Sequence, residues 1–205
     1  MPKISTTLAS TIVTNARAYL NEATASFWSD AELLVWVNNA IIDVVTRSRC
    51  IETTENVTLV AAQAEYAITA SYIGITGAFY NDGTTIKGLQ RRAIKDIGTE
   101  EYSTVPIYWY EWNGKIGIYP VATAATAGKI VTVYLISRPT AVIASGTIPT
   151  PACYDRLLTI FVAAQGYKKD SQFDKATALM AEYIESIDRF RVDYLQKPKE
   201  IEDVS

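Results

Sequence analysis

Histidine is absent from all 205 residues of the chain, and cysteine occurs only twice. Histidine is the commonest general base in enzymes and a frequent zinc ligand, so its absence disfavours most hydrolase and metalloenzyme mechanisms. The two cysteines, Cys50 and Cys153, lie far apart in the sequence and lack a metal-binding spacing. We therefore predict no catalytic residue, no cofactor site and no metal site, and we expect a protein that is not an enzyme.

A large excess of one charge is also absent, because 19 Lys and Arg residues stand against 22 Asp and Glu residues, a net charge of -3. This balance provides no positive field to hold a nucleic acid. Long apolar runs are missing too: residues 157–167, the longest strongly apolar run without charge, fall well short of the roughly 20 residues that a membrane-spanning helix needs. The first residues have no apolar signal segment, so we expect a soluble, cytoplasmic product without a membrane partner.

Paired carboxylates are the remaining basis for an enzymatic mechanism. Asp170 with Asp174, and Glu185 with Asp188, have spacings that place both acids on one side of a helix. Acids at such positions normally face solvent or pair with a cation one turn away. The pairs therefore indicate solvated helix surfaces rather than a glycosidase site.

Helical patterns occupy both ends of the chain. Apolar side chains recur at steps of three and four from Ile4, and Ser29 with Glu32 forms a capping box before a second helix. Thr150-Pro151 predicts the start of a third helix that continues to about Lys169. A fourth helix has a heptad repeat, which suits packing within the chain or against another molecule. The repeat consists of Phe173, Ala176, Met180, Tyr183, Ile187, Phe190 and Tyr194.

The middle of the chain is rich in β-branched and aromatic residues and has turn signals at short intervals, which is typical of an antiparallel sheet. Asn113-Gly114 predicts a two-residue hairpin turn. Such a turn pairs Trp112 with Lys115, Tyr110 with Gly117, and Tyr108 with Tyr119. Alternation along the two strands places the aromatic residues Tyr108, Tyr110, Trp112 and Tyr119 on one face. It places four other residues on the opposite, core-facing side, namely Ile107, Trp109, Ile116 and Ile118.

These patterns predict an α+β protein in which the N- and C-terminal helix pairs form an α-helical bundle with an inserted antiparallel β domain. The bundle would comprise residues 1–50 and 150–197, and the β domain residues 51–149. Lys197-Pro198 would stop the last helix and leave an acidic C-terminal tail over residues 198–205.

Two groups of side chains in the β region are candidates for an interaction surface: the aromatic face of the hairpin and the densest basic pair. They comprise Tyr108, Tyr110, Trp112, Tyr119, Arg91 and Arg92. Tyrosine and tryptophan anchor protein interfaces and also stack on sugars, and their alternative role is packing beneath a neighbouring element. Alternation puts the two arginines on opposite faces. They would be solvated, pair with Glu100 and Glu101, or contact an acidic partner or passing DNA.

Several segments resemble, in order, those of tailed-bacteriophage head-to-tail adaptor proteins. The N-terminal segments are Leu20-Asn21-Glu22, Phe27-Trp28-Ser29-Asp30-Ala31-Glu32-Leu33 and Trp36-Val37-Asn38-Asn39-Ala40. Val105-Pro106 with Trp109, residues 115–120 and residues 131–139 are similar to the β insert of that family. Residues 148–158 are similar to its return to helix.

The resemblance implies a structural virion protein of the neck, assembled in the host cytoplasm. Its copies would form a ring, commonly of twelve, that joins the portal protein to downstream tail proteins and lets genomic DNA pass without sequence-specific binding. Family adaptors often touch the portal with terminal segments, so the acidic tail after Pro198 would be a portal or tail contact. The alternative is a carbohydrate- or receptor-binding virion module that uses the aromatic face.

Overall fold

The computed structural model describes residues 4–98 and 103–195, with side chains described as far as residue 190. The chain divides into two compact units. One unit combines Met1–Ile51 with Pro139–Ser205 and contains the α-helices, and the other is Glu52–Arg138 and contains the strands. The acidic tail predicted over residues 198–205 lies outside the described residues.

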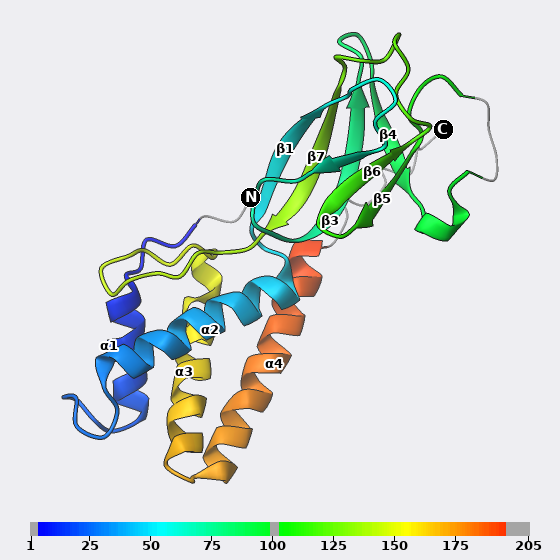
Figure 1. The fold of residues 1–205 in the computed structure, drawn as a ribbon. Helices are drawn as coiled ribbons and strands as arrows, with labels where there is room; N and C mark the ends of the chain where they lie inside the picture. Colours follow the sequence, from blue (N-terminus) through cyan, green and yellow to red (C-terminus); the bar gives the residue numbers. More distant parts are fainter. Residues whose placement is uncertain (1–3, 99–102, 196–205) are drawn as a thin grey trace, which may run out of the picture. The chain divides into compact units, whose positions relative to one another are not determined.

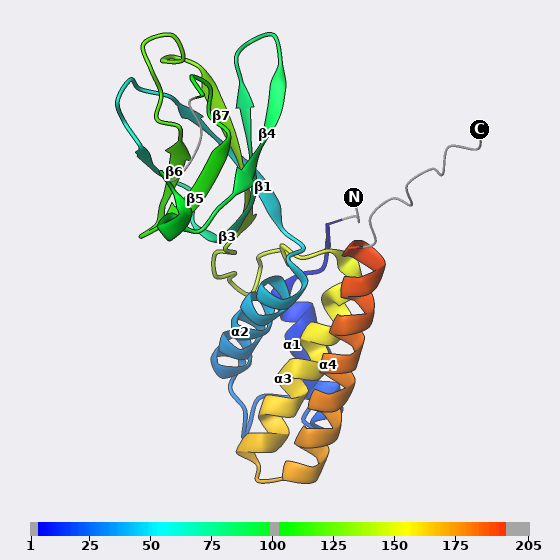
Figure 2. The ribbon, with the colours of Figure 1, turned by 90° about the vertical axis from the view of Figure 1, so that its right-hand side faces the viewer.

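Within the described residues, the helical unit contains four α-helices that pack against one another (Figures 1 and 2). They are α1 (Ala9–Tyr19), α2 (Asp30–Ser48), α3 (Asp155–Lys169) and α4 (Phe173–Leu195), with a short 3-10 helix, η2 (Ala152–Tyr154), before α3. The α3 helix contacts the other three and is buried over most of its surface, as its nearly continuous apolar run requires. None of the described helices is both long and apolar enough to span a lipid bilayer.

The helix starts agree with the sequence prediction at α2 and differ at α1 and α3. The Ser29 side chain accepts a hydrogen bond from the Glu32 backbone N–H, which confirms the predicted cap. By contrast, α1 begins only at Ala9, because residues 4–8 lie antiparallel to residues 147–151. The Ser5 and Thr7 hydroxyls donate to Asp155 Oδ2 at 2.7 and 2.6 Å, and such bonds compete with helix formation. The same residue, Asp155, is where α3 begins.

The heptad stripe on α4 is partly buried inside the helical unit. Ala176, Tyr183 and Ile187 are buried, Met180 and Phe190 are half-buried, and Phe173 at the first heptad position is exposed. The Tyr183 hydroxyl donates to Asp43 Oδ2 of α2 at 2.7 Å, and burial together with this bond raises the pKa of Tyr183. The side chain of Tyr194 is not among those described. The described part of the stripe therefore serves mainly the packing of the chain itself.

Within the described residues, the strands form a seven-stranded sheet in the order β1-β7-β3-β4-β5-β6-β2. Their bounds are β1 Glu52–Thr58, β2 Glu65–Ala67, β3 Tyr72–Asn81, β4 Ile86–Arg91, β5 Tyr108–Trp112, β6 Lys115–Tyr119 and β7 Ile130–Ser137. One face of the sheet encloses a core to which all seven strands contribute buried side chains, including Val57, Tyr66, Tyr80, Leu89, Trp109, Ile116 and Val133. The unit therefore has a hydrophobic core of its own.

The predicted fold class, a helical bundle with an inserted antiparallel β domain, is wrong. The chain is α+β overall. Its described residues form four α-helices and a nearly closed, barrel-like sheet of seven strands. The sheet is also not wholly antiparallel, because β4 and β5 run parallel. The prediction rested on hairpin signals, which can report only antiparallel neighbours. A short 3-10 helix, η1 (Ile94–Asp96), lies in the long connection between β4 and β5.

The predicted register of the Asn113-Gly114 hairpin is confirmed. Strands β5 and β6 pair Trp112 with Lys115, Tyr110 with Gly117, and Tyr108 with Tyr119. Asn113 and Gly114 both have positive φ, at 47° and 70°, as a type I′ turn requires. The faces divide as predicted for Trp109, Ile116 and Ile118, which lie in the core. Ile107, predicted with them, precedes β5, is half-buried and is not part of the core cluster.

Candidate interaction surface

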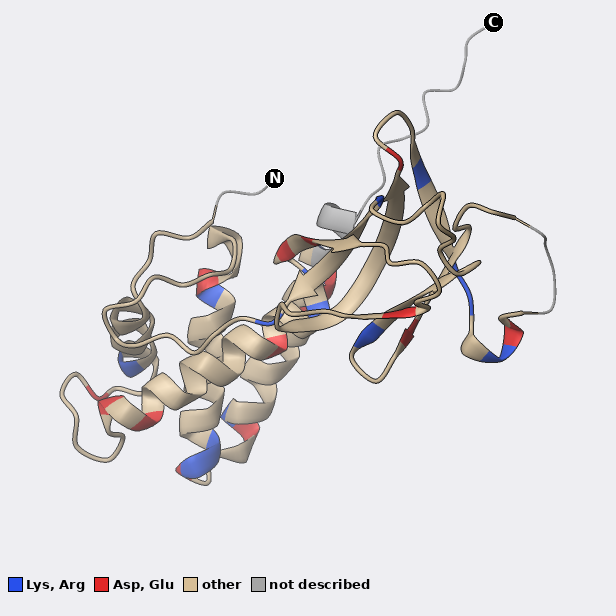
Figure 3. Ribbon diagram, turned by 45° about the horizontal axis from the view of Figure 1, so that its top comes forward, with Lys and Arg blue, Asp and Glu red and all other residues tan. Residues whose placement is uncertain are grey.

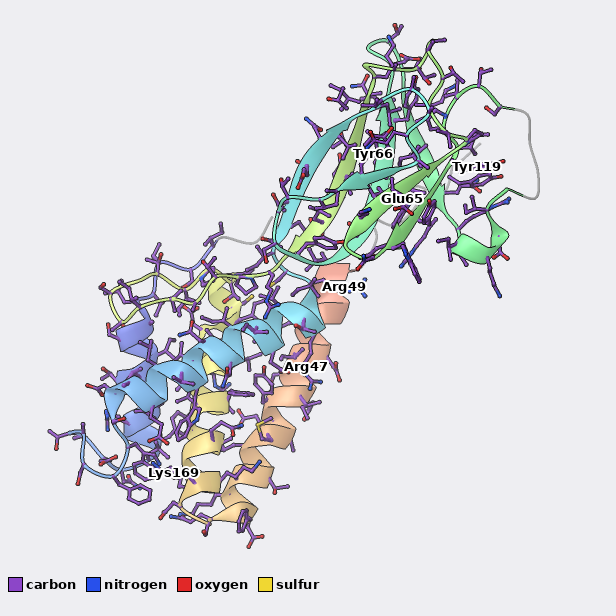
Figure 4. The ribbon with its side chains drawn as sticks, in the orientation of Figure 1. Arg47, Arg49, Glu65, Tyr66, Tyr119 and Lys169 are labelled. Carbon is purple, nitrogen blue, oxygen red and sulfur yellow. The ribbon has the colours of Figure 1, made fainter. Side chains whose placement is uncertain are left out.

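The predicted aromatic surface lies on the outer face of β5 and β6, opposite the core. Its four aromatic residues differ in accessibility: Tyr108 and Tyr110 are buried, Tyr119 is half-buried, and Trp112 is 56% exposed. Figure 4 labels Tyr119 at the end of β6 and Glu65 on the neighbouring β2. The structure thus brings the four residues to one face and leaves Trp112 as the most accessible aromatic ring among them.

Tyr110 is buried because its ring lies across the backbone of Gly117 and reaches the next strand. A Cβ at Gly117 would lie 2.0 Å from Tyr110 Cζ, so only glycine fits beneath the ring. The Tyr110 hydroxyl is 3.5 Å from Glu65 Oε1 on β2, and Lys115 Nζ is 3.5 Å from Glu65 Oε2. Burial, followed by the nearby Glu65 carboxylate, raises the pKa of Tyr110. These contacts tie three strands together across the outer face.

The two arginines lie on opposite faces, as alternation predicted. The Arg92 guanidinium carbon is 3.8 Å from the centroid of the Tyr108 ring, and Arg92 Nη2 donates to the Tyr108 hydroxyl at 2.9 Å. Arg91 lies over the core residue Trp109 at 5.3 Å and pairs with Glu111 at 3.8 Å. The alternative partners, Glu100 and Glu101, are outside the described residues. Arg92 therefore covers part of the aromatic face, and the six residues do not form one continuous exposed patch.

Three residues of the N-terminal motifs hold a buried arginine that the sequence analysis missed. Arg17 of α1 is buried, and its Nη2 donates to the Trp28 carbonyl and to Asp30 Oδ1, both at 2.7 Å. Arg17 Nη1 lies 3.4 Å from Glu22 Oε2. Two features of the sequence could have indicated this network. Arg17 is a single arginine on the apolar side of α1, and the loop that follows has an acid at each end, Glu22 and Asp30.

Glu22 orders the loop between α1 and α2 from within. Its carboxylate accepts hydrogen bonds from the backbone N–H groups of Ser26, Phe27 and Trp28. Desolvation alone would raise the pKa of Glu22, but these backbone donors and Arg17 outweigh it, so the pKa is lowered. The carboxylate therefore stays ionised and holds the loop that enters α2.

Asn38, in the second motif, clamps the chain that returns from the sheet to the helices. Its Oδ1 accepts from the Val142 backbone N–H at 2.7 Å, and its Nδ2 donates to the Val142 carbonyl at 3.1 Å. A side chain that both accepts from the N–H and donates to the C=O of one residue in this way is an amide. The N-terminal motif residues thus act in the architecture of the helical unit.

The chain also has an outward sheet face that the sequence analysis did not identify. It is formed by the outward positions of β1 after Glu52 and by those of β7, β3 and β4, and we call it the neutral face. Glu52, at the start of β1, is exposed on the same side and is not part of it. Its members are Thr54, Asn56, Thr58, Ile130, Thr132, Tyr134, Gly77, Phe79, Asn81, Ile86 and Gly88. None of them is charged, and β3 and β7 carry no Asp, Glu, Lys or Arg at all (Figure 3). That absence of charge from residues 72–81 and 130–137 was the available sequence signal.

The thiols and acids show no arrangement suited to metal chemistry in the part of the chain that the structure describes, since it has no cluster of three or more potential ligands. Cys50 and Cys153 are half-buried thiols of the helical unit. Burial raises the pKa of Cys50, which keeps that thiol protonated at neutral pH.

Comparison with protein families matches residues 7–200 to the family described as SU10 adaptor protein. No curated protein sequence matches the chain. The family match covers both structural units and includes the hairpin, the Arg17 network and the Asn38 clamp described above. It agrees with the resemblance found in the sequence, and the chain belongs to the SU10 adaptor family of phage head-to-tail adaptor proteins.

Proposed function

We propose that this protein is a structural, non-enzymatic component of the phage neck, where its copies form a ring between the portal protein and the tail proteins. The carrying observation is the family match over residues 7–200, because a phage adaptor is a component of the virion that interacts with portal and tail. A ring of twelve copies, assembled in the host cytoplasm, is part of the proposal. Uncharged and aromatic outward surfaces on the sheet support a role in protein–protein contact.

The proposal includes passage of genomic DNA through the ring during ejection. A conduit should not retain DNA, and retention would require many phosphate contacts from Lys and Arg. The net charge of -3 favours passage without sequence-specific binding. The two candidate arginines also have partners within the chain, Arg91 with Glu111 and Arg92 with Tyr108.

A carbohydrate- or receptor-binding role is the second candidate, and the exposure of Trp112 is the observation that favours it. An exposed indole can stack on a sugar ring. Burial of Tyr108 and Tyr110 leaves a smaller aromatic platform than the sequence predicted. This candidate predicts that Trp112→Ala abolishes glycan binding while portal-dependent assembly remains.

Mixing the purified protein with the portal protein of the same phage tests the proposal. We expect electron micrographs to show rings on the portal, and mass spectrometry of intact particles to detect the chain. Absence of the chain from particles, or a monomer that binds glycans and ignores the portal, would contradict the adaptor role. A monomer in isolation is compatible with assembly that begins on the portal.

A further inference from the structure

The neutral face has an aromatic anchor that the chain itself holds in place. Phe79 points outward between the core residues Ala78 and Tyr80. Carbons of its ring would lie 3.5 Å and 3.7 Å from a Cβ at Gly88 and Gly77, so the ring rests over two glycines. Because the ring is already ordered, covering it costs little additional side-chain entropy.

Further apolar side chains surround this anchor. The Tyr134 ring meets Phe79 edge-on at 5.2 Å, and Ile130 lies on the same strand as Tyr134. Ile86, on β4, is 69% exposed. Each of these residues is partly or largely open to solvent, and together they form a contiguous patch over β4, β3 and β7. Patches of this kind on a folded surface mark sites of protein contact.

Two hydrogen bonds within the chain engage polar side chains of the neutral face. The Thr132 hydroxyl donates to Asn56 Oδ1 at 2.8 Å across β7 and β1. Asn81 Oδ1 accepts from the Gly83 backbone N–H at 2.8 Å. A partner that covers the Thr132 hydroxyl and the two amide oxygens therefore need not replace these hydrogen bonds. A charged partner would lose its own hydration without an opposite charge to pair with. The face fits an uncharged protein surface and does not fit DNA.

The chain carries a second exposed, uncharged surface on α2, which we call the α2 stripe. It consists of Ala31, Val35, Asn39, Ile42 and Thr46. Steps of three and four residues place them on one side of the helix, opposite its buried positions. Val35 is 57% exposed. A helix with one apolar side in its own core and a second neutral side in solvent has a surface available for packing on a sheet.

We propose that the neutral face of one copy binds the α2 stripe of a second copy of this chain. The two surfaces match in charge, since neither has any, and a helix packing on a sheet face is a standard layer of protein architecture. The contact is heterologous, so a series of bound copies always has one free neutral face at one end and one free α2 stripe at the other, and rotation can close the series into a ring. The inference rests on the proposed function, because it names the contact between copies in the ring.

Single charged substitutions test each surface. Ile86→Glu on the neutral face and Val35→Glu on the α2 stripe each place a carboxylate in the contact, and we expect each to weaken association between copies by roughly a hundredfold. Both side chains are largely exposed, so folding, checked by circular dichroism, should be retained. Val60→Glu is the matched control, since Val60 is 51% exposed in the sheet unit and belongs to neither surface.

Assembly on the portal, viewed by electron microscopy, is the first readout. We expect rings from the wild type and Val60→Glu and none from the other two variants. Rings from Ile86→Glu or Val35→Glu at wild-type yield would overturn the inference and leave the proposed function standing. Failure of the wild type to join the portal or to appear in particles would instead overturn the proposed function.

A mixture of the two variants separates this contact from a symmetric one. The Val35→Glu copy retains an intact neutral face, and the Ile86→Glu copy retains an intact α2 stripe, so one undamaged contact forms between them. With the portal protein present, we expect chemical cross-linking to give a one-to-one dimer of the two variants in the equal mixture and no dimer of either variant alone. A mixture that gives no cross-linked dimer on the portal, or a variant that dimerises alone, would overturn the proposed pairing.

Discussion

The buried guanidinium of Arg17 meets the Trp28 carbonyl, Asp30 and Glu22, so it joins the end of α1 to the start of α2. A buried cation is tolerated when its donors are satisfied, and removing it leaves acids and a carbonyl without their partner. The network explains in physical terms why acids stand at positions 22 and 30 of the N-terminal motif.

Arg17→Met should therefore destabilise the helical unit by about 2–3 kcal/mol, a value below that of a fully buried pair because Asp30 is largely exposed. The free energy of unfolding from urea titration measures the change. Arg189→Ala is the control: its pair with Glu185 is exposed and one turn apart on α4, and its loss should cost no more than about 0.5 kcal/mol. Equal effects of the two substitutions would contradict a special role for Arg17.

Gly117 provides a second residue-scale prediction. Gly117→Ala forces the ring of Tyr110 away from the backbone that it covers, and we expect a loss of about 1–2 kcal/mol in the free energy of unfolding, with Tyr110 more exposed. Gly74→Ala is the matched control on β3, because a Cβ there meets nothing within 4 Å. Urea titration and tyrosine fluorescence report the two effects. If Gly117→Ala were as mild as Gly74→Ala, the ring would not be fixed over the glycine.

At the scale of elements, local signals were readable from the sequence and long-range pairings were not. Asn113-Gly114 set the β5–β6 register, because a two-residue turn leaves a single way to pair its flanking strands. The parallel pairing of Gln90 with Tyr108 has no comparable signature, since the connection between β4 and β5 is long. The closing of the sheet into a barrel-like form depends on such pairings, which is why the fold class was predicted wrongly.

The candidate surface shows the same division. Alternation correctly placed Tyr108 and Tyr110 on one face and separated Arg91 from Arg92. Their burial depends on Glu65 from β2 and Arg92 from β4, and sequence spacing did not indicate that these strands flank the hairpin. The alternation of residues along a strand shows on which face of the sheet each side chain lies. Whether that side chain is exposed depends on the neighbouring strands, and their order in the sheet is not visible in the sequence.

Glu55 on β1 links the edge strand to the chain at residues 69–70 and makes the sheet unit sensitive to acid. Its carboxylate accepts from the backbone N–H groups of Thr69 and Ala70 and from the Thr69 hydroxyl. Desolvation raises the pKa of Glu55, but these donors outweigh it and hold the pKa below its ordinary value of 4.5. The stabilisation is present above the unfolded pKa and is lost as pH falls through the lower, folded pKa.

We expect the urea midpoint of the wild type to fall as the pH drops from about 6 to about 3, with Glu55 contributing at the acidic end of this range. Glu55→Gln cannot ionise, so its midpoint should be lower near neutral pH and should approach that of the wild type in acid. Glu52→Gln, on the same strand and exposed, is the control. If the urea midpoints of Glu55→Gln and the wild type changed in parallel with pH, the Glu55 carboxylate would contribute nothing to the link between β1 and residues 69–70.

At the scale of the whole molecule, the two units are built differently from the chain. The helical unit needs both ends of the sequence, because α1 and α2 pack with α3 and α4 from the other end, and residues 4–8 lie along residues 147–151. The sheet unit is a single continuous segment, Glu52–Arg138. The proposed contact between copies uses one surface from each unit, so both must fold for a ring to grow.

The sheet unit should fold without the helices, because its core residues all come from its own segment. We expect a fragment of residues 52–138 to unfold cooperatively on heating and to keep the near-ultraviolet dichroism of its buried Trp109 and tyrosines. A fragment of residues 1–51 provides the contrast and should lack a cooperative transition, since α1 and α2 lose the helices that cover them. Gradual melting of the 52–138 fragment would mean that the sheet depends on the helical unit. Cooperative melting, together with failure of the fragment to join portal-bound rings, would fit a sheet that supplies only one of the two surfaces of the proposed contact.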